Sequence, residues 1–216
     1  MKNNTRNLNM VNGQIKPING IGERITSIFY SLDRSDFIPE ELSNNSFLEK
    51  NLILSNERVI LKPEIVAKIA MHINLKENEN VLILGSTNGY LAAILSLMAE
   101  TVIVVEEDDK LIRFSEENIK KNEINNVIFI KKNISEGCAE QSPFNAIIIE
   151  GAIERLPQNI LNQLEPGGRL LTFLSENGTC KAKMFTRKEA IFHSEYLFPC
   201  SVPVLNSFKQ KNIFSF

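Results

Sequence analysis

The chain has 216 residues, of which 43% are hydrophobic, and it carries a formal net charge of −2 with a pI near 5.8. That length suits one compact α/β unit better than two full domains. The weakly acidic balance argues against nucleic-acid binding through a broad basic surface, so a small or neutral partner is expected.

The cysteines and the N-terminus bear on location and metal binding. Three cysteines stand far apart and in no C-x-x-C arrangement, which is typical of reduced thiols. With only two histidines, the spacing of a structural zinc site is not present, and we expect no metal. The N-terminus is polar where a signal peptide needs an apolar core, and no run approaches the roughly 18 apolar residues of a membrane span. We therefore expect a cytoplasmic protein with no membrane partner.

The first 62 residues are expected to form an arm and a cap. Residues 1–19 are polar with scattered apolar anchors, and Pro17 and the Asn19-Gly20 pair break any long helix. Apolar residues between 23 and 32 recur at helical spacing and predict one short amphipathic helix. Residues 40–62 are irregular and predict a loop with two short extended pieces, at 52–54 and 59–61.

Residues 63–216 are predicted to form a single core in which helices and strands alternate. Pro63 suits the first turn of a helix that ends near Asn74. Further helices are expected at 91–99, 110–122 and 157–164, and strands at 81–84, 101–107, 127–130, 145–150 and 169–174. This alternation predicts a parallel sheet, and the strand-like runs 182–187 and 191–198 predict a final hairpin. The expected fold is a Rossmann-like doubly wound sheet of about seven strands that ends in an antiparallel pair.

A glycine turn follows the first buried strand of this core. Val81 to Leu84 run directly into Gly85, which permits a sharp turn, and the first backbone N–H groups of the next helix would point into the crevice above the strand ends. Thr87 stands where nucleotide-binding turns carry another glycine, between Gly85 and Gly89. The turn is therefore open to two interpretations, a binding site for a nucleotide-like ligand and an ordinary strand-to-helix connection.

The second strand ends in two acids, Glu106 and Glu107. Glu106 follows Gly85 at close to the roughly 20 residues at which a carboxylate receives the ribose hydroxyls in doubly wound nucleotide sites. Carboxylates also favour helix N-termini, so a solvated acidic turn over residues 107–109 is the alternative interpretation. We favour a ribose contact for Glu106.

Several segments resemble one family of proteins. They are Asn-Met-Val-Asn-Gly-Gln at 9–14, Asp-Phe-Ile-Pro-Glu at 36–40, Ser-Glu-Gly at 135–137, Pro-Phe-Asn at 143–145 and Gln-Leu-Glu-Pro-Gly-Gly-Arg-Leu at 163–170. With the order of the elements, they resemble class I S-adenosylmethionine-dependent methyltransferases, and more narrowly the protein-L-isoaspartate O-methyltransferase family. The similarity runs from about residue 9 to the end.

The resemblance implies methyl transfer from S-adenosyl-L-methionine to an exposed carboxylate of a damaged protein or peptide, as a repair reaction. An isoaspartyl carboxylate is already ionised near pH 7, so catalysis would consist of positioning the reactants and excluding water. Residues 1–62 would then be the substrate-side cap. The implied cofactor-binding residues are Gly85, Ser86, Thr87, Asn88, Gly89, Tyr90, Glu106, Glu107, Asn133, Ile134 and Glu150, and the implied substrate-orienting residues are Ser55, Asn56 and Arg58.

The sequence departs from the family pattern at three places. The family has an acid two residues before the first glycine, which would meet the cofactor's ammonium group, and this chain has Ile83 there. Thr87 replaces a glycine of the turn. In the substrate loop, two hydroxyl-bearing positions are aliphatic, Val59 and Leu61. Asn133 replaces an acid that approaches the adenine, a mild change because an amide both accepts and donates hydrogen bonds.

These departures leave open the role of Arg58 and the function itself. Arg58 is suited to bind a carboxylate bidentately, and the alternative is an exposed arginine on a loop. An isoaspartyl methyltransferase is our first hypothesis. The alternatives are a family member that keeps the fold only as an interaction module, and one that methylates another substrate. A Thr87 side chain in the cofactor's place would favour the interaction module.

Overall fold

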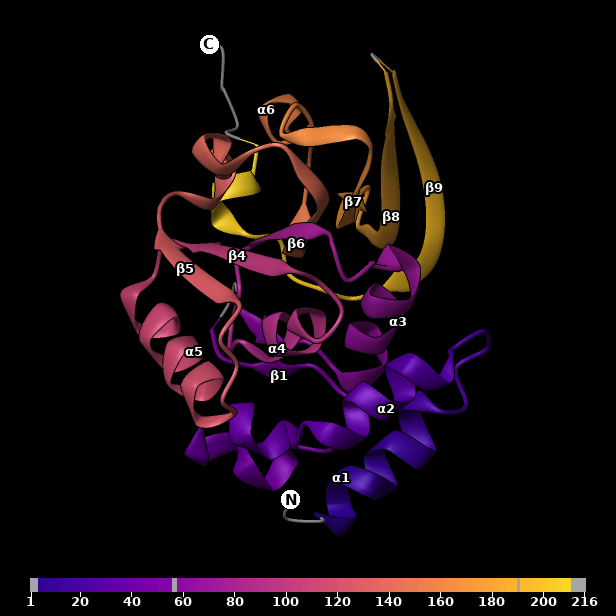
Figure 1. Ribbon diagram of the computed structural model, residues 1–216, viewed down its shortest axis with the longest axis vertical. Coiled ribbons are helices and arrows are strands. Elements are labelled where there is room, and N and C mark those ends of the chain that lie inside the picture. The colour runs from indigo at the N-terminus through magenta and orange to yellow at the C-terminus, as the bar shows by residue number, and fades with distance from the viewer. Residues whose placement is uncertain (1–3, 56–57, 190, 211–216) are drawn as a thin grey trace.

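A seven-stranded sheet forms the centre of the computed structural model, which describes residues 4–55, 58–189 and 191–210. The strand order is β5-β4-β3-β6-β7-β8-β9 (Figure 1). Neighbouring strands from β5 to β7 are parallel, and β8 is antiparallel to both β7 and β9. The predicted fold class is confirmed. The bounds are β3 Asn80–Leu84, β4 Thr101–Glu106, β5 Val127–Lys131, β6 Phe144–Ile153, β7 Leu164–Glu176, β8 Thr179–Lys188 and β9 Ile191–Cys200.

Helices cover one face of this sheet with a large hydrophobic core. Alternate aliphatic residues of the central strands, such as Val81, Ile83 and Ile148, point to this face because successive strand residues alternate sides. The helices that supply the other half of the core are α1 Thr5–Met10, α2 Glu23–Ser31, α3 Pro63–Ile73, α4 Tyr90–Ser96 and α5 Asp109–Lys121.

The opposite face carries a smaller core. Leu82, Leu84 and Ile149 pack there against α6 (Gln158–Leu161), the 3-10 turn η4 (Ile134–Glu136), and the C-terminal segment. A further 3-10 turn, η5 Ala139–Gln141, precedes β6. The protein is therefore a three-layer structure in which the carboxyl ends of β3, β4 and β6 meet at one edge.

The N-terminal segment is more helical than its polar composition predicts. α1 continues into a five-residue π-helix, η1 Val11–Ile15, because Met10, Val11 and Ile15 are buried in the main core. After α2 come the 3-10 turns η2 Arg34–Phe37 and η3 Glu40–Asn45. The two predicted extended pieces are present as an antiparallel pair, β1 Leu52–Ile53 and β2 Val59–Ile60.

Some predicted bounds are wrong. The helix expected at 157–164 is only the single turn α6, and β7 begins at Leu164 and not at residue 169, because Leu164 pairs with Phe144 before a register shift. α4 ends at Ser96, three residues before the expected end. The other strands and helices of the core lie close to their predicted positions.

The C-terminal segment returns to the sheet after β9. The Ala152 N–H donates to the Pro203 carbonyl and the Leu205 N–H donates to the Ala152 carbonyl, both at 3.0 Å, so this segment runs parallel to the end of β6. A last 3-10 turn, η6 Asn206–Phe208, follows. In Figure 1 this segment, coloured yellow, lies beside the end of β6. Residues far apart in sequence therefore meet at the edge where β3 and β6 end.

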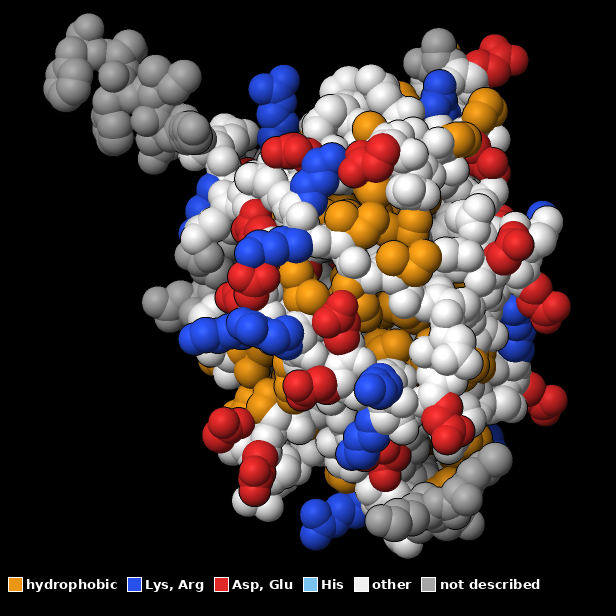
Figure 2. Space-filling view, turned by 60° about the vertical axis from the view of Figure 1, so that its left-hand side comes forward, with side chains coloured by type: hydrophobic (Ala, Val, Ile, Leu, Met, Phe, Trp, Pro, Cys, Tyr) orange, Lys and Arg blue, Asp and Glu red, His pale blue; other side chains and the backbone are white. Residues whose placement is uncertain are grey.

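The surface beside β5 and α5 mixes charges of both signs. Figure 2 shows acidic and basic side chains interspersed on this face, with hydrophobic side chains visible between them. This mixture fits the small net charge of the chain. Among the described residues, no helix is long and apolar enough to cross a membrane.

Candidate active site

The glycine turn connects β3 to α4 and is fully enclosed. Gly85 and Gly89 have φ angles of +82° and +79°, a region that side chains with a Cβ disfavour. A Cβ at Gly85 would lie 3.0 Å from Arg58 Nη1, 3.1 Å from Leu205 Cδ1 and 3.6 Å from Ile134 Cδ1. Side chains from three distant segments therefore converge on the backbone of Gly85.

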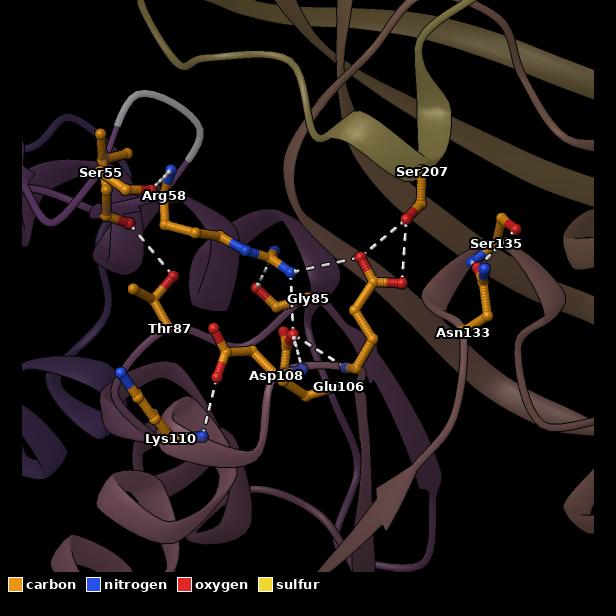
Figure 3. Close-up of polar contacts among 12 residues, drawn as sticks. Ser55, Arg58, Gly85, Thr87, Glu106, Asp108, Lys110, Asn133, Ser135 and Ser207 are labelled. Carbon is orange, nitrogen blue, oxygen red and sulfur yellow. Dashed lines mark hydrogen bonds and ion pairs between the residues drawn. The ribbon is translucent and has the colours of Figure 1, made fainter.

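The side chains of the turn hold the N-terminal cap against the sheet. Thr87 Oγ1 donates to the Val59 carbonyl at 3.2 Å, and Asn88 Nδ2 donates to the Phe37 carbonyl at 2.9 Å. The Thr87 side chain thus points toward β2, as Figure 3 shows. The contacts nearest to Gly85 come instead from Arg58 and Leu205.

Tyr90 begins α4 and lies in the core beneath the turn. Its ring contacts Phe37, with 5.2 Å between ring centroids, and the Arg34 guanidinium carbon lies 5.0 Å from its centroid. Burial raises the pKa of the Tyr90 hydroxyl. Arg34 is itself fully buried and donates to the carbonyls of Ser46 and Leu61, both at 2.8 Å. Arg34 therefore fixes both ends of the segment 46–61. Burial lowers the pKa of Arg34 to about 10.

Glu106 ends β4 with a side chain that is 1% exposed. Its Oε1 accepts hydrogen bonds from Arg58 Nη2 at 2.8 Å and from the backbone N–H groups of Glu107 and Asp108 at 2.8 and 3.0 Å (Figure 3). Its Oε2 has no partner among the described residues. Burial raises the pKa of Glu106, and the Arg58 charge offsets part of that effect. One carboxylate oxygen is therefore fixed and the other is available.

Arg58 reaches this acid from the hairpin between β1 and β2. The N–H groups of Leu54 and Ser55 both donate to the Arg58 carbonyl, and Ser55 Oγ accepts from the Arg58 N–H at 3.1 Å, which holds Arg58 beside the end of β1. The guanidinium then extends over Gly85, where Nη1 lies 3.4 Å from the Gly85 carbonyl oxygen. With a side chain only 13% exposed, Arg58 is not an exposed loop arginine, so that alternative is wrong.

Glu107 connects the site to the C-terminal segment. Ser207 Oγ lies 2.8 and 2.9 Å from the two carboxylate oxygens of Glu107, and Arg58 Nη2 lies 4.0 Å from the nearer one. Glu107 therefore lies between Arg58 and Ser207. The next residue, Asp108, caps α5 by accepting from the Lys110 N–H at 2.8 Å. The acids after β4 therefore have structural partners.

Glu150 lies in the neighbouring central strand β6, level with Gly85, and is 4% exposed. Its Oε2 has no hydrogen-bond partner among the described residues, and the Oγ of adjacent Ser86 likewise has none of good geometry. Burial raises the pKa of Glu150 to about 8. The Ser86 hydroxyl and the charges of Arg58 and Arg34 lower it, and the charge of Glu106 raises it.

The remaining predicted residues lie around the same edge or outside the described chain. Asn133 follows β5, and its Oδ1 accepts from the N–H and the hydroxyl of Ser135 at 2.9 and 2.7 Å. Ile134 is fully buried near Gly85. Asn56 lies outside the described residues. Ile83 is buried among aliphatic residues of the main core.

Sequence reasoning missed Arg34, Leu205 and Ser207. Arg34 precedes Asp36-Phe37-Ile38-Pro39 in the motif that carried the resemblance, so the motif itself was a usable signal. Leu205 and Ser207 lie in a C-terminal stretch whose composition gives no indication that it returns to the sheet.

The comparison with known families agrees with this fold. The sequence profile of protein-L-isoaspartate(D-aspartate) O-methyltransferase matches residues 7–206. The chain belongs to this family. Among its relatives, the protein-L-isoaspartate O-methyltransferase of Myxococcus xanthus is 32% identical over 72% of this chain and 73% of that protein. The one of Methanospirillum hungatei is 28% identical over 86% of each chain.

Solved structures share the fold of this protein-L-isoaspartate O-methyltransferase family member. A Plasmodium falciparum protein assigned to the same enzymes, solved in complex with S-adenosyl-L-homocysteine, superposes with a TM-score of 0.78. It is 23% identical, and the match covers 94% of this chain and 97% of that one. Another protein-L-isoaspartate O-methyltransferase gives a TM-score of 0.81 at 20% identity, over 92% of this chain and 65% of the other.

Proposed function

We propose that this protein is an S-adenosyl-L-methionine-dependent methyltransferase that methylates the isoaspartyl carboxylate of damaged proteins. The observation that carries the proposal is a pair of buried acids, Glu106 and Glu150, at the carboxyl edge of the sheet beside Gly85. Each has a carboxylate oxygen without a hydrogen-bond partner among the described residues. Because buried polar atoms are normally paired, these two oxygens indicate a ligand with several donors.

The chain's own residues fit the cofactor that the family name implies. Glu106 Oε2 suits the ribose hydroxyls, since a carboxylate at the end of the second strand accepts both of them. The backbone of residues 85–90 would hold the ligand, because Gly85 lacks a Cβ that would block its approach. Asn133 and Ile134, after β5, are proposed to flank the adenine, with Glu107 beside the ribose. When bound, the cofactor supplies an electrophilic methyl group on a positively charged sulfur.

The reaction depends on how the protein positions the reactants more than on proton transfer. An isoaspartyl carboxylate is ionised near pH 7 and is itself the nucleophile. The protein must hold that carboxylate in line with the methyl group and keep water away. Leu205 and Ile134 supply apolar walls. We propose that Ser55, Asn56 and Arg58 orient the acceptor, because the Arg58 guanidinium extends over Gly85.

The partner is accordingly a protein or peptide with an exposed carboxylate, and the proposed location is the cytoplasm. Cys138, Cys180 and Cys200 are free thiols, which supports a reducing compartment. The mixed surface charge gives no support to a nucleic-acid partner.

One observation favours the second candidate, an interaction module without catalysis. Arg58 Nη1 and Leu205 Cδ1 lie so close to Gly85 that a ligand against its backbone must displace both side chains. A permanently closed crevice would exclude the cofactor. The sequence suggested that a Thr87 side chain in the cofactor's place would favour such a module. In the structure this side chain instead points away and donates a hydrogen bond to β2.

Calorimetry followed by a methylation assay separates these functions. The purified protein is titrated with S-adenosyl-L-methionine and with S-adenosyl-L-homocysteine. It is then given labelled cofactor and an isoaspartyl peptide, with the aspartyl peptide of the same sequence as control. We expect binding of both compounds and label only in the isoaspartyl peptide. An absence of heat at millimolar cofactor would refute methyl transfer, and binding without labelled peptide would indicate a different acceptor.

A further inference from the structure

Glu150 is a buried acid whose partners do not account for it. The residue pairing of β3 with β6 places Leu84 beside Ile149, so Glu150 lies next to Gly85 at the edge of the sheet. Its side chain is on the same face as that of Ile148, the neighbour of Ile83. An acidic group is thus present in β6 beside Gly85, two residues beyond the level at which β3 carries the aliphatic Ile83.

The charges that face Glu150 come from three other segments. Arg34 of η2 and Arg58 of the β1–β2 hairpin are positive, and Glu106 of β4 is negative. The Arg58 guanidinium already binds Glu106 Oε1 at 2.8 Å, and Arg34 donates to two backbone carbonyls. Neither arginine forms a hydrogen bond with Glu150 among the described residues, so its Oε2 stays unpartnered at 4% exposure. A buried carboxylate in this state is unfavourable unless a cation reaches it.

The proposed cofactor carries such a cation. In the proposed arrangement, the residues after β4 and β5 bind its adenosine end. The amino-acid end, which carries an α-ammonium group, then lies at the strand ends on the other side of Gly85. We propose that Glu150 is the residue that binds the α-ammonium group of the cofactor, in place of the acid that β3 lacks at Ile83. This inference rests on the proposed function, since it assigns one part of the same ligand. Ser86, beside Glu150, would donate its hydroxyl to the same carboxylate.

The test pairs one substitution with one change in the ligand. S-adenosyl-L-homocysteine and its deaminated analogue, in which hydrogen replaces the ammonium group, are titrated by calorimetry into the wild type and into Glu150→Gln. We expect Glu150→Gln to weaken homocysteine binding by about 10-fold or more, because a charge-assisted hydrogen bond is lost. The deaminated analogue should bind both proteins equally, within about 2-fold. Glu154→Gln, four residues further along the chain, is the matched control and should change neither affinity.

A second measurement needs only the wild type. At pH 7 most of the Glu150 carboxyl is protonated in the free protein, because its pKa is about 8. Pairing with an ammonium group ionises it, so binding of S-adenosyl-L-homocysteine should release a proton. That proton appears as a dependence of the binding heat on the ionisation heat of the buffer. The deaminated analogue also reaches Glu106, so proton release from that acid would occur with both ligands and can be subtracted.

The outcomes distinguish this inference from the proposed function. Glu150→Gln could weaken the binding of both ligands equally, or both ligands could release equal numbers of protons on binding to the wild type. Either result would mean that Glu150 only supports the fold, and it would overturn the inference without affecting the proposal of methyl transfer. If the wild type binds neither ligand, both proposals fail. Selective loss of the ligand that carries the ammonium group would support both.

Discussion

β4 and β6 each place a glutamate inside the protein at the edge where β3 ends, but the two acids are in different states. Glu106 accepts three hydrogen bonds on one oxygen, from Arg58 and two backbone N–H groups. Glu150 has a raised pKa of about 8 and an oxygen without a partner among the described residues. The first acid is held in place before any ligand arrives, which lowers the cost of ordering it. The second is mostly protonated near pH 7, and it becomes charged when a cation binds.

Removing the preorganised acid should give the largest effect on ligand affinity. Glu106→Ala deletes the carboxylate that would accept two ribose hydroxyls, and it leaves Arg58 without its closest partner. Two charge-assisted hydrogen bonds correspond to a loss of about 100-fold in affinity for S-adenosyl-L-homocysteine. Calorimetry on Glu106→Ala and on Glu117→Ala, an exposed acid of α5, checks this. Similar affinities for the two variants would mean that Glu106 has no role in ribose binding.

The second acid, Glu150, should make stability depend on pH. A carboxyl whose pKa is raised on folding stabilises the protein fully below its ordinary value near 4.5, and that contribution is lost as the pH rises through about 8. The difference in unfolding free energy between the wild type and Glu150→Gln should therefore shift by about 4 kcal/mol against the wild type between pH 5 and pH 9.

Urea titrations of both proteins across that range measure this difference. The pKa of Glu106 is also raised, but Glu106 is present in both proteins and its contribution cancels in the comparison. The groups that face Glu150 are Arg34, Arg58 and Glu106, and the pKa of Arg34, about 10, lies above this range. A difference that does not vary with pH would show that Glu150 is ionised throughout.

Replacing Arg58, which binds Glu106 and faces Glu150, should have an intermediate effect. Arg58→Ala removes the group proposed to orient the acceptor carboxylate, and turnover of an isoaspartyl peptide at saturating cofactor should fall by about 10-fold. Arg113→Ala, an exposed arginine of α5, is the matched control. Unchanged turnover in Arg58→Ala would leave this arginine only its contacts with Glu106 and Gly85.

The smallest effect is expected at Asn133. Asn133→Asp restores the acid found in the family, and the Oδ1 that accepts from Ser135 is retained because a carboxylate caps a 3-10 turn equally well. The affinity for S-adenosyl-L-homocysteine should change by no more than about 2-fold. A larger change, measured by the same calorimetry, would assign Asn133 a more specific adenine contact than proposed.

The sequence predicted the parts of the fold that depend on local pattern. The order of strands followed from buried runs separated by helices, and the final hairpin followed from its short connection. The bounds of β7 did not, because Leu164 pairs with Phe144 across a register shift that propensity does not encode. The helical state of residues 11–15 also depended on tertiary packing, since apolar side chains there enter the main core.

The site was predictable where it lies at strand ends. Gly85 and Glu106 stand directly at or after buried strands, and the carboxyl ends of parallel strands share one edge. The unpartnered state of Glu150 was not predictable, because it depends on what Arg34 and Arg58 bind instead. Leu205 gave no signal at all, since its position depends on hydrogen bonds between the C-terminal segment and Ala152.

Gly151 shows what that returning segment means for the order in which the protein is made. A Cβ at Gly151 would overlap the Leu205 side chain, so the glycine provides the space into which Leu205 packs. Leu205 is separated from Gly85, which it covers, by more than half of the chain. Contacts over such a distance in sequence form late. A chain still on the ribosome therefore lacks this wall of its crevice until the segment after β9 has been made and has packed against β6.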